Sequence, residues 1–144
     1  MVLGKLANGL MGNFSEQDSQ KLTTEYQDFL FADEVIMKGY QLIRDALIFT
    51  NFRIIFVDKQ GATGKKTAFQ SIYLDDIIDV EVETAGALAD DSELTITYLT
   101  NVYQRSNQQM TETKTFEFPK NTNIAELYTM IGDMVIKNRR RINN

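Results

Sequence analysis

The chain has 144 residues, with 15 basic residues against 20 acidic ones, and it contains neither cysteine nor histidine. These absences exclude disulfides, thiol nucleophiles and thiolate metal sites, and they remove the commonest general base and transition-metal ligand. The net charge of −5 argues against a dedicated nucleic-acid binder. We therefore expect a single-domain-sized protein that is not an enzyme and that holds no cofactor or metal.

The amino-terminal stretch shows no targeting pattern. Gly4, Lys5, Asn8 and Gly9 interrupt the region where a signal peptide would need continuous apolar residues. Val2 stands where myristoylation would require a glycine. No apolar run approaches the roughly 18 residues of a transmembrane helix. We therefore expect a cytoplasmic protein.

Residues 1–30 predict two short helices. The apolar residues from Leu3 to Phe14 have helical spacing, but three glycines each weaken such a helix by about 1 kcal/mol relative to alanine, so it needs a partner surface. Ser15, with Asp18 three residues later, is typical of a helix N-cap. The apolar face of this second helix comprises Leu22, Tyr26, Phe29 and Leu30.

After Asp33 the apolar spacing changes to that of strands. We predict seven of them, at about 35–43, 46–50, 53–58, 67–73, 77–84, 92–99 and 113–118. In the sixth, Leu94 and Ile96 alternate with Thr95 and Thr97. In the fifth, Ile78, Val80 and Val82 alternate with Asp79, Glu81 and Glu83. Such alternation predicts half-buried antiparallel strands.

The end of the chain predicts one amphipathic helix. Pro119 follows the last strand, and Asn123 with Glu126 three residues later reads as a capping pair. The apolar stripe comprises Ile124, Leu127, Tyr128, Ile131, Met134 and Val135. The cations Lys137, Arg139, Arg140 and Arg141 follow at the end where they favour the helix dipole, and we expect a solvated helix end there.

Two motifs carry a family resemblance: Thr50-Asn51-x-Arg53, and the run Val57-Asp58-Lys59-Gln60-Gly61-x-Thr63-Gly64-Lys65-Lys66. With them, residues 34 to 135 resemble the bacterial pleckstrin-homology-like (PH-like) family of small proteins of unknown function. The resemblance implies a PH-like barrel of seven antiparallel strands in two near-orthogonal sheets, capped by the C-terminal helix and preceded by short N-terminal helices. We accordingly expect an N-terminal helical segment over 1–32 and a PH-like domain over 33–144. The long polar connection between Asn101 and Thr113 departs from the compact glycine turn expected of the family.

The glycine-rich run over residues 61–66 invites a phosphate-loop interpretation. Walker A would require a glycine where Lys59 stands and Ser or Thr where Lys66 stands. The same Gly61-x-x-Gly64 differs from the clamp of a KH domain, because that clamp joins helices and this run joins strands. A tight strand connection is favoured instead, and it leaves Lys59, Lys65 and Lys66 available to an anionic partner.

The run from residue 75 to residue 93 is acidic and contains no basic residue. Its acids are Asp75, Asp76, Asp79, Glu81, Glu83, Asp90, Asp91 and Glu93. A calcium site would need oxygens that converge on one loop, with glycine at the sixth position of an EF-hand register. Because the acids of residues 79–83 alternate along a strand, we favour a solvated face over a metal site, with acidic docking as its functional reading.

The family resemblance implies closed rings of PH-like domains with a hydrophilic surface where neighbouring strands meet. We expect a non-catalytic interaction and scaffolding module that forms a cyclic homo-oligomer, with a pentamer as the best estimate, and that binds a further protein but no nucleic acid. Contact between the basic run 59–66 and the acidic run 75–93 of a neighbour gives the ring a physical basis. The candidate interaction residues are Asn51, Arg53, Lys59, Gln60, Thr63, Lys65 and Lys66. Among them, the planar fork of Arg53 suits a carboxylate best.

The alternative is a peripheral membrane module that binds anionic lipid through the N-terminal apolar stripe and the terminal arginines. Eukaryotic relatives of the fold bind phosphoinositides through a basic first hairpin. Here that hairpin, residues 41–46, has only Arg44 as a cation, and Asp45 neutralises it. The resemblance therefore does not carry over a lipid pocket.

Overall fold

The computed structural model describes residues 16–42, 45–60, 66–85 and 91–144. They form two compact units, the first ending at Ile72 and the second running from Tyr73 to Asn144. The expected helix over residues 3–14 and the expected Ser15 cap lie outside the described residues. Within the described ranges, no helix combines the length and the apolar character needed to cross a membrane.

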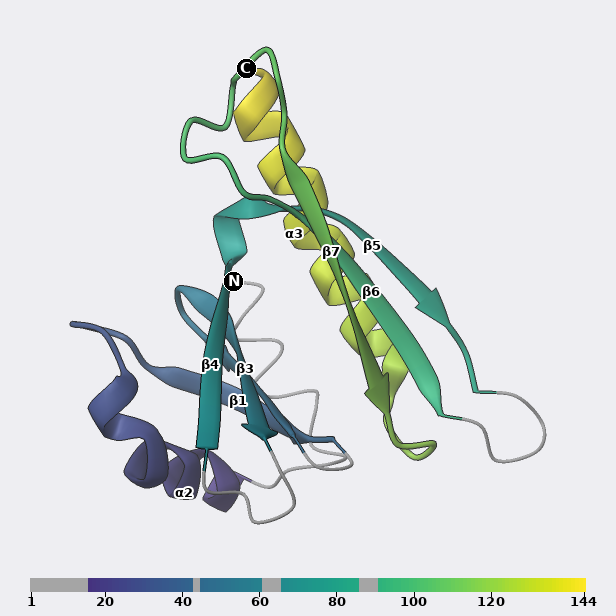
Figure 1. The fold of residues 1–144 in the computed structure, drawn as a ribbon. Helices are drawn as coiled ribbons and strands as arrows, with labels where there is room; N and C mark the ends of the chain where they lie inside the picture. Colours follow the sequence, from purple (N-terminus) through teal and green to yellow (C-terminus); the bar gives the residue numbers. More distant parts are fainter. Residues whose placement is uncertain (1–15, 43–44, 61–65, 86–90) are drawn as a thin grey trace. The chain divides into compact units, whose positions relative to one another are not determined.

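The first unit is a helix followed by a four-stranded sheet (Figure 1). Its elements are α2 (Glu16–Tyr26), the 3-10 turn η1 (Gln27–Phe29), β1 (Ile36–Gln41), β2 (Ala46–Thr50), β3 (Arg53–Gln60) and β4 (Lys66–Tyr73). The strands lie in the order β1-β2-β3-β4, with Ile48 of β2 opposite Gly39 of β1 and Ile55 of β3. Strands β1 and β4 are therefore the edges of this sheet.

Helix α2 packs on this sheet as part of its core. Leu22 and Tyr26 are buried, and they belong to one cluster with Ile36, Ala46, Ile48, Ile55 and Val57. Gly39 of β1 permits the close approach of the helix, because a Cβ at this position would collide with the side chain of Leu22. The other two residues of the expected apolar face differ: Phe29 lies in η1 and is half exposed, and Leu30 is partly buried.

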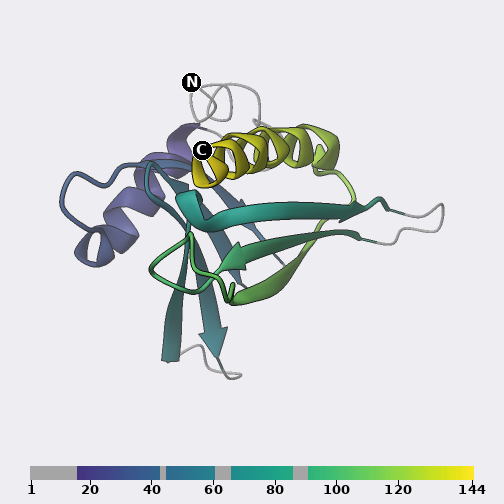
Figure 2. The same cartoon turned by 90° about the horizontal axis from the view of Figure 1, so that it is seen from above.

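The second unit is a three-stranded antiparallel sheet with a long helix. Its elements are η2 (Leu74–Asp76), β5 (Ile77–Glu83), β6 (Ser92–Leu99), β7 (Thr111–Phe118) and α3 (Ile124–Asn143), with the strands in the order β5-β6-β7. Figure 2 shows α3 lying along one face of this sheet. The other face of the sheet carries the polar residues that alternate with the core residues of each strand.

Helix α3 is fixed at its start and in its last turns. The Asn123 side chain accepts a hydrogen bond from the Glu126 backbone N–H at 3.3 Å, which confirms the expected capping pair. Near the other end, the buried amide of Asn138 donates to the carbonyls of Leu74 and Ile77, both at 2.8 Å. This one side chain therefore ties the helix to η2 and to the start of β5.

The sequence-based strand predictions are confirmed, because all seven strands are present with bounds within two residues of those expected. Strand β7 begins at Thr111, so the polar connection after β6 is shorter than expected. Tyr128, expected in the buried stripe of α3, is instead exposed. The expected domain boundary after residue 32 and the near-orthogonal angle between the sheets stay predictions.

Candidate functional site

The motif Thr50-Asn51-x-Arg53 forms the turn between β2 and β3, and it holds the segment that leads into β1. The Asn51 side chain accepts from the Val35 N–H at 2.8 Å and donates to the Asp33 carbonyl at 3.0 Å. Asp33 has a φ of 63°, a left-handed conformation that residues other than glycine rarely adopt. The bonds from Asn51 on either side of Glu34 therefore fix a bend in the entry to the sheet.

Arg53 is the centre of this turn and is only 4% exposed. Its Nε donates to Glu34 Oε2 at 2.8 Å and its Nη2 donates to Glu34 Oε1 at 2.9 Å, which makes a bidentate ion pair. Its Nη2 also donates to the Phe29 carbonyl at 2.9 Å, and its Nη1 donates to Ser71 Oγ at 2.7 Å. The Phe31 ring covers the guanidinium, with 3.7 Å from Cζ to the ring centroid.

Glu34 receives hydrogen bonds from two further groups besides carrying the ion pair. The Phe31 N–H donates to Oε1 at 2.9 Å, and the Thr50 hydroxyl lies 2.7 Å from Oε2. Burial alone would raise the pKa of Glu34, but the bonds from Arg53, Phe31 and Thr50 and the charge of Arg53 outweigh burial and lower this pKa. The carboxylate is therefore held ionised, and it joins the β2–β3 turn to the chain before β1.

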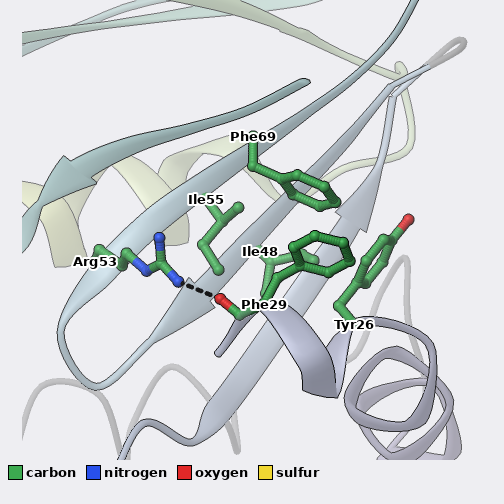
Figure 3. A pocket seen from close by; sticks show the side chains of 6 residues that line it. All are labelled: Tyr26, Phe29, Ile48, Arg53, Ile55 and Phe69. Atoms are coloured by element: carbon green, nitrogen blue, oxygen red, sulfur yellow. Dashed lines mark hydrogen bonds between the residues drawn. The ribbon is translucent and has the colours of Figure 1, made fainter. Parts of the chain in front are cut away.

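A small cavity lies beside the Arg53–Glu34 ion pair, between η1 and the sheet (Figure 3). Its volume is about 10 Å³, roughly the space of one water molecule, and it is lined by Tyr26, Phe29, Ile48, Arg53, Ile55 and Phe69. The Phe29 and Phe69 rings stack with centroids 4.4 Å apart, and Tyr26 meets Phe69 edge-on at 5.7 Å. Burial, together with Glu25, raises the pKa of Tyr26 to about 12. The cavity therefore has aromatic walls, a protonated phenol and one committed guanidinium.

The seven candidate interaction residues fall into two groups at opposite ends of β3. Asn51 and Arg53 lie at the start of β3, and both are bonded within the first unit. The carboxylate that Arg53 binds is Glu34 of the same chain, whereas the sequence suggested a carboxylate of a partner. At the other end lie Lys59, Gln60 and Lys66. Thr63 and Lys65 lie outside the described residues.

At this second end of β3, the main chain is anchored and one cation is exposed. The Lys59 N–H donates to Asp45 Oδ1 at 3.0 Å, and the Lys59 side chain is half-buried. Lys66 begins β4 and is exposed. A role for the seven residues in interaction stays a prediction, with Lys66 as the exposed representative of the basic run.

The register of the second sheet brings its acids together across three strands. Glu83, Glu93 and Glu117 are directly opposite one another. The next two rows are Glu81 with Thr95 and Thr115, and Asp79 with Thr97 and Thr113. The Thr95 and Thr115 hydroxyls lie 2.8 Å apart. These nine residues, here called the acidic face, include five carboxylates and no cation, and each is exposed or half-buried.

The carboxylates of the acidic face are spread along the three strands. Among residues 16–42, 45–60, 66–85 and 91–144, no group of three or more acidic side chains converges to hold a metal ion. The sequence pattern located Asp79, Glu81, Glu83 and Glu93 and the alternating Thr95 and Thr97. It missed Thr113, Thr115 and Glu117, because cross-strand register is not visible in one strand. The alternation of side chains along residues 111–117 is the sequence signal that could have located these residues of β7.

Comparison with known proteins agrees with the architecture. The model of the bacterial PH domain family matches residues 5–135. The chain is 45% identical over 89 residues to "Uncharacterized protein YjqA" of Bacillus subtilis (strain 168), a match covering 62% of this chain and 71% of that protein.

Solved structures of similar proteins have the same fold. A pleckstrin homology domain from Shewanella amazonensis SB2B matches with a TM-score of 0.63 and 32% identity, over 87% of this chain and 94% of that chain. A DUF1696 family protein with a pleckstrin-homology domain from Shewanella loihica PV-4 matches with a TM-score of 0.60 and 30% identity, over 81% and 92%. These matches confirm the PH-like fold expected from the sequence.

Proposed function

Because the chain belongs to the bacterial PH domain family, we propose that it is a non-catalytic interaction module of the cytoplasm that self-assembles into a closed ring. The ring presents a hydrophilic surface to a protein partner. The ring geometry comes from the family resemblance, with a pentamer as the best estimate. The charge distribution of this chain supplies the physical reason for assembly.

The observation that carries the proposal is the acidic face of the second sheet. Carboxylates directly opposite one another on adjacent strands repel, and the row Glu83, Glu93 and Glu117 places three of them side by side. Within the part of the chain that the structure describes, no ion pair neutralises this row. A cationic surface from outside the sheet therefore lowers the free energy of the acidic face.

The basic run 59–66 of a neighbouring copy is the complementary surface in this proposal. Lys66 is exposed at the start of edge strand β4, and Lys59 lies near the end of β3. A contact between unlike patches on identical chains is heterologous, and it produces a ring where the rotation between neighbours closes. Such an interface also excludes copies in the wrong orientation, because like-charged patches would then meet.

Light scattering after size exclusion tests the ring and its charge pairing. We expect a closed oligomer at low salt that weakens at high salt, because screening acts over about 10 Å at 0.1 M salt. Lys66→Glu and Glu81→Lys should each weaken the assembly, and the combination should restore it if the two patches meet. Lys120→Glu changes an exposed lysine outside both patches and serves as the matched control. A monomer under every condition contradicts the ring. If the combined Lys66→Glu and Glu81→Lys variant does not regain assembly, only the proposed contact between the two patches is contradicted.

A second candidate function is binding to anionic membranes, and one feature of the second unit favours it. Val102 and Tyr103 are strongly exposed on the loop between β6 and β7. The same unit carries Arg105 and the cations near the end of α3. Flotation with vesicles of phosphatidylcholine, with and without phosphatidylserine, tests this candidate. Val102→Ser should reduce flotation if the β6–β7 loop inserts into the membrane. Absence of flotation contradicts the membrane candidate.

A further inference from the structure

The second unit contains a cavity at the C-terminal end of α3, separate from the acidic face. It is lined by Ile78, Leu99, Gln109, Arg139, Ile142 and Asn143. Its volume is about 200 Å³, somewhat below the range of about 300–1,000 Å³ typical of sites for drug-sized ligands, so it suits a small ligand or the end of a larger one. Its lining has three aliphatic side chains, two amides and one guanidinium, and no acid.

Arg139 is held in place by one hydrogen bond from its Nε, which leaves its two terminal nitrogens unbonded within the described residues. Its Nε donates to the Ile78 carbonyl at 2.6 Å, and Ile78 lies where the β5–β6 register shifts. In the part of the chain that the structure describes, neither terminal nitrogen of Arg139 has a hydrogen-bond partner. Its side chain is exposed. The four N–H groups of these two nitrogens are therefore available to a ligand.

The two amides of the cavity are also held with donors to spare. The Gln109 Nε2 donates to the Gln104 carbonyl at 2.9 Å, and the Asn143 Nδ2 donates to the Arg139 carbonyl at 2.7 Å. Each of these nitrogens carries a second N–H. Gln104 is itself bonded to Asp76 Oδ1 at 2.7 Å, which fixes the loop wall of the cavity. The donors therefore sit on an anchored frame.

The charge around the cavity favours an anion. Lys137 lies two residues before Arg139 on α3, whereas the guanidinium of Arg141 is bonded to Gln104 and to the Asp75 carbonyl, and that of Arg105 is bonded to Asn144. The helix dipole opposes an anion here, but it amounts to only about half a charge at a helix C-terminus. The guanidinium of Arg139 carries a full charge, and no lining residue neutralises it. The positive side chains therefore outweigh the dipole.

We propose that this cavity binds an aliphatic carboxylate. The terminal nitrogens of Arg139 receive the carboxylate, since a guanidinium fork matches its two oxygens. Ile78, Leu99 and Ile142 receive the aliphatic group. The chemistry is shared by a free small carboxylate and by the chain end of a peptide with an aliphatic last residue. The site does not depend on ring assembly.

Calorimetric titration of the full chain tests the site with four probes. N-acetyl-leucine and the peptide N-acetyl-Ala-Ala-Ala-Leu carry the carboxylate, and their amidated forms keep the aliphatic group without the charge. We expect the carboxylates to bind and the amides to bind roughly 10- to 100-fold more weakly. Peptide binding tenfold tighter than N-acetyl-leucine identifies a chain end as the source, and equal binding identifies a small carboxylate. Absence of binding by both carboxylates overturns the proposal, as does equal binding of the amides.

Two matched variants separate the fork from general charge. Arg139→Gln should abolish the difference between carboxylate and amide, whereas Arg140→Gln removes the same charge from the neighbouring exposed position and should leave this difference unchanged. Equal losses in the two variants overturn the proposal in favour of non-specific attraction. Arg139→Lys keeps the charge without the fork and should bind more weakly than wild type, which provides a test if Arg139→Gln does not fold. Probe-induced NMR shifts of the Leu99 and Ile142 methyl groups place the ligand, and their absence overturns the site.

Discussion

The guanidinium of Arg53 and the carboxylate of Glu34 form a buried bidentate ion pair, with Nε to Oε2 at 2.8 Å and Nη2 to Oε1 at 2.9 Å. The pair joins the start of β3 to the segment before β1. The same guanidinium holds the Phe29 carbonyl and Ser71 of β4. One arginine therefore links both edges of the first unit to the turn that follows α2.

Removing one partner of this pair should destabilise the protein strongly. Glu34→Gln leaves a buried guanidinium without its counter-charge, and such changes cost about 3–5 kcal/mol. Glu34→Leu combined with Arg53→Met should cost less than the sum of the single changes, because no charge is left unpaired. Urea unfolding measures both. Asp133→Asn, on an exposed position of α3 outside the acidic face, is the control, expected within about 0.5 kcal/mol of wild type. A loss of unfolding free energy in Glu34→Gln as small as that of the control would contradict a stabilising role for the Arg53–Glu34 ion pair.

The ion pair should also make stability depend on pH. The pKa of Glu34 is lower in the folded chain than its ordinary value of 4.5. Ionised Glu34 therefore stabilises the fold above that value, and this stabilisation is lost as the pH falls through the lowered pKa. The difference in unfolding free energy between wild type and Glu34→Gln should be constant near neutral pH and shrink below about pH 4. A difference that persists unchanged in acid would assign the effect to packing.

Two glycines provide a matched test of the packing of α2. Gly39→Ala forces the side chain of Leu22 to move and should cost about 1–3 kcal/mol. Leu22→Ala in the same chain should relieve part of this cost, since the collision involves those two residues alone. Gly132→Ala lies in α3 with nothing within 4 Å of the added Cβ, and it should stabilise by about 0.5–1 kcal/mol. Thermal unfolding of the variants measures these differences. Equal effects at Gly39 and Gly132 would contradict the close packing of Leu22 against Gly39.

Local patterns predicted most of the fold. Alternation along residues 77–83 and 92–99 is a property of single strands, and it located β5 and β6 closely. The Asn123 cap was equally visible, because its partner Glu126 is three residues away. The motif Thr50-Asn51-x-Arg53, which carries the family resemblance, also marked the β2–β3 turn. Interactions between residues close in the sequence were therefore enough to predict which segments are strands or helices and where most of them begin and end.

The candidate site was less predictable because its partners are distant in the sequence. Arg53 was recognised as a carboxylate binder, but Glu34 lies 19 residues earlier and carries no local signal of burial. The row Glu83, Glu93 and Glu117 depends on the register of three strands. Arg139 was interpreted as a solvated helix end, since neither its bond to Ile78 nor the cavity follows from helical spacing. Register and tertiary contact supplied what the sequence pattern lacked.

Deletion of residues 1–32 tests whether the amino-terminal helices belong to the fold. A PH-like domain over 33–144, as the sequence predicts, would stay folded without this segment, and its assembly would change if the glycine-containing first helix is a docking element. The structure instead places Leu22 and Tyr26 in the core of the first unit, and the Phe29 carbonyl on Arg53. We therefore expect the truncated chain to lose most of its stability, since it uncovers Ile48 and Ile55 and removes one acceptor of a buried guanidinium.

Circular dichroism and urea unfolding of two truncations separate the contributions. A chain starting at Glu16 retains α2 and should be clearly more stable than a chain starting at Asp33, which should unfold at much lower urea or lack a cooperative transition. Leu22→Ala in the full chain should lie between them, at a cost of about 2–5 kcal/mol for a buried leucine. If the chain starting at Asp33 unfolds at the wild-type midpoint, the buried face of α2 contributes nothing to stability, and the sequence-based interpretation of the segment as a docking element is restored.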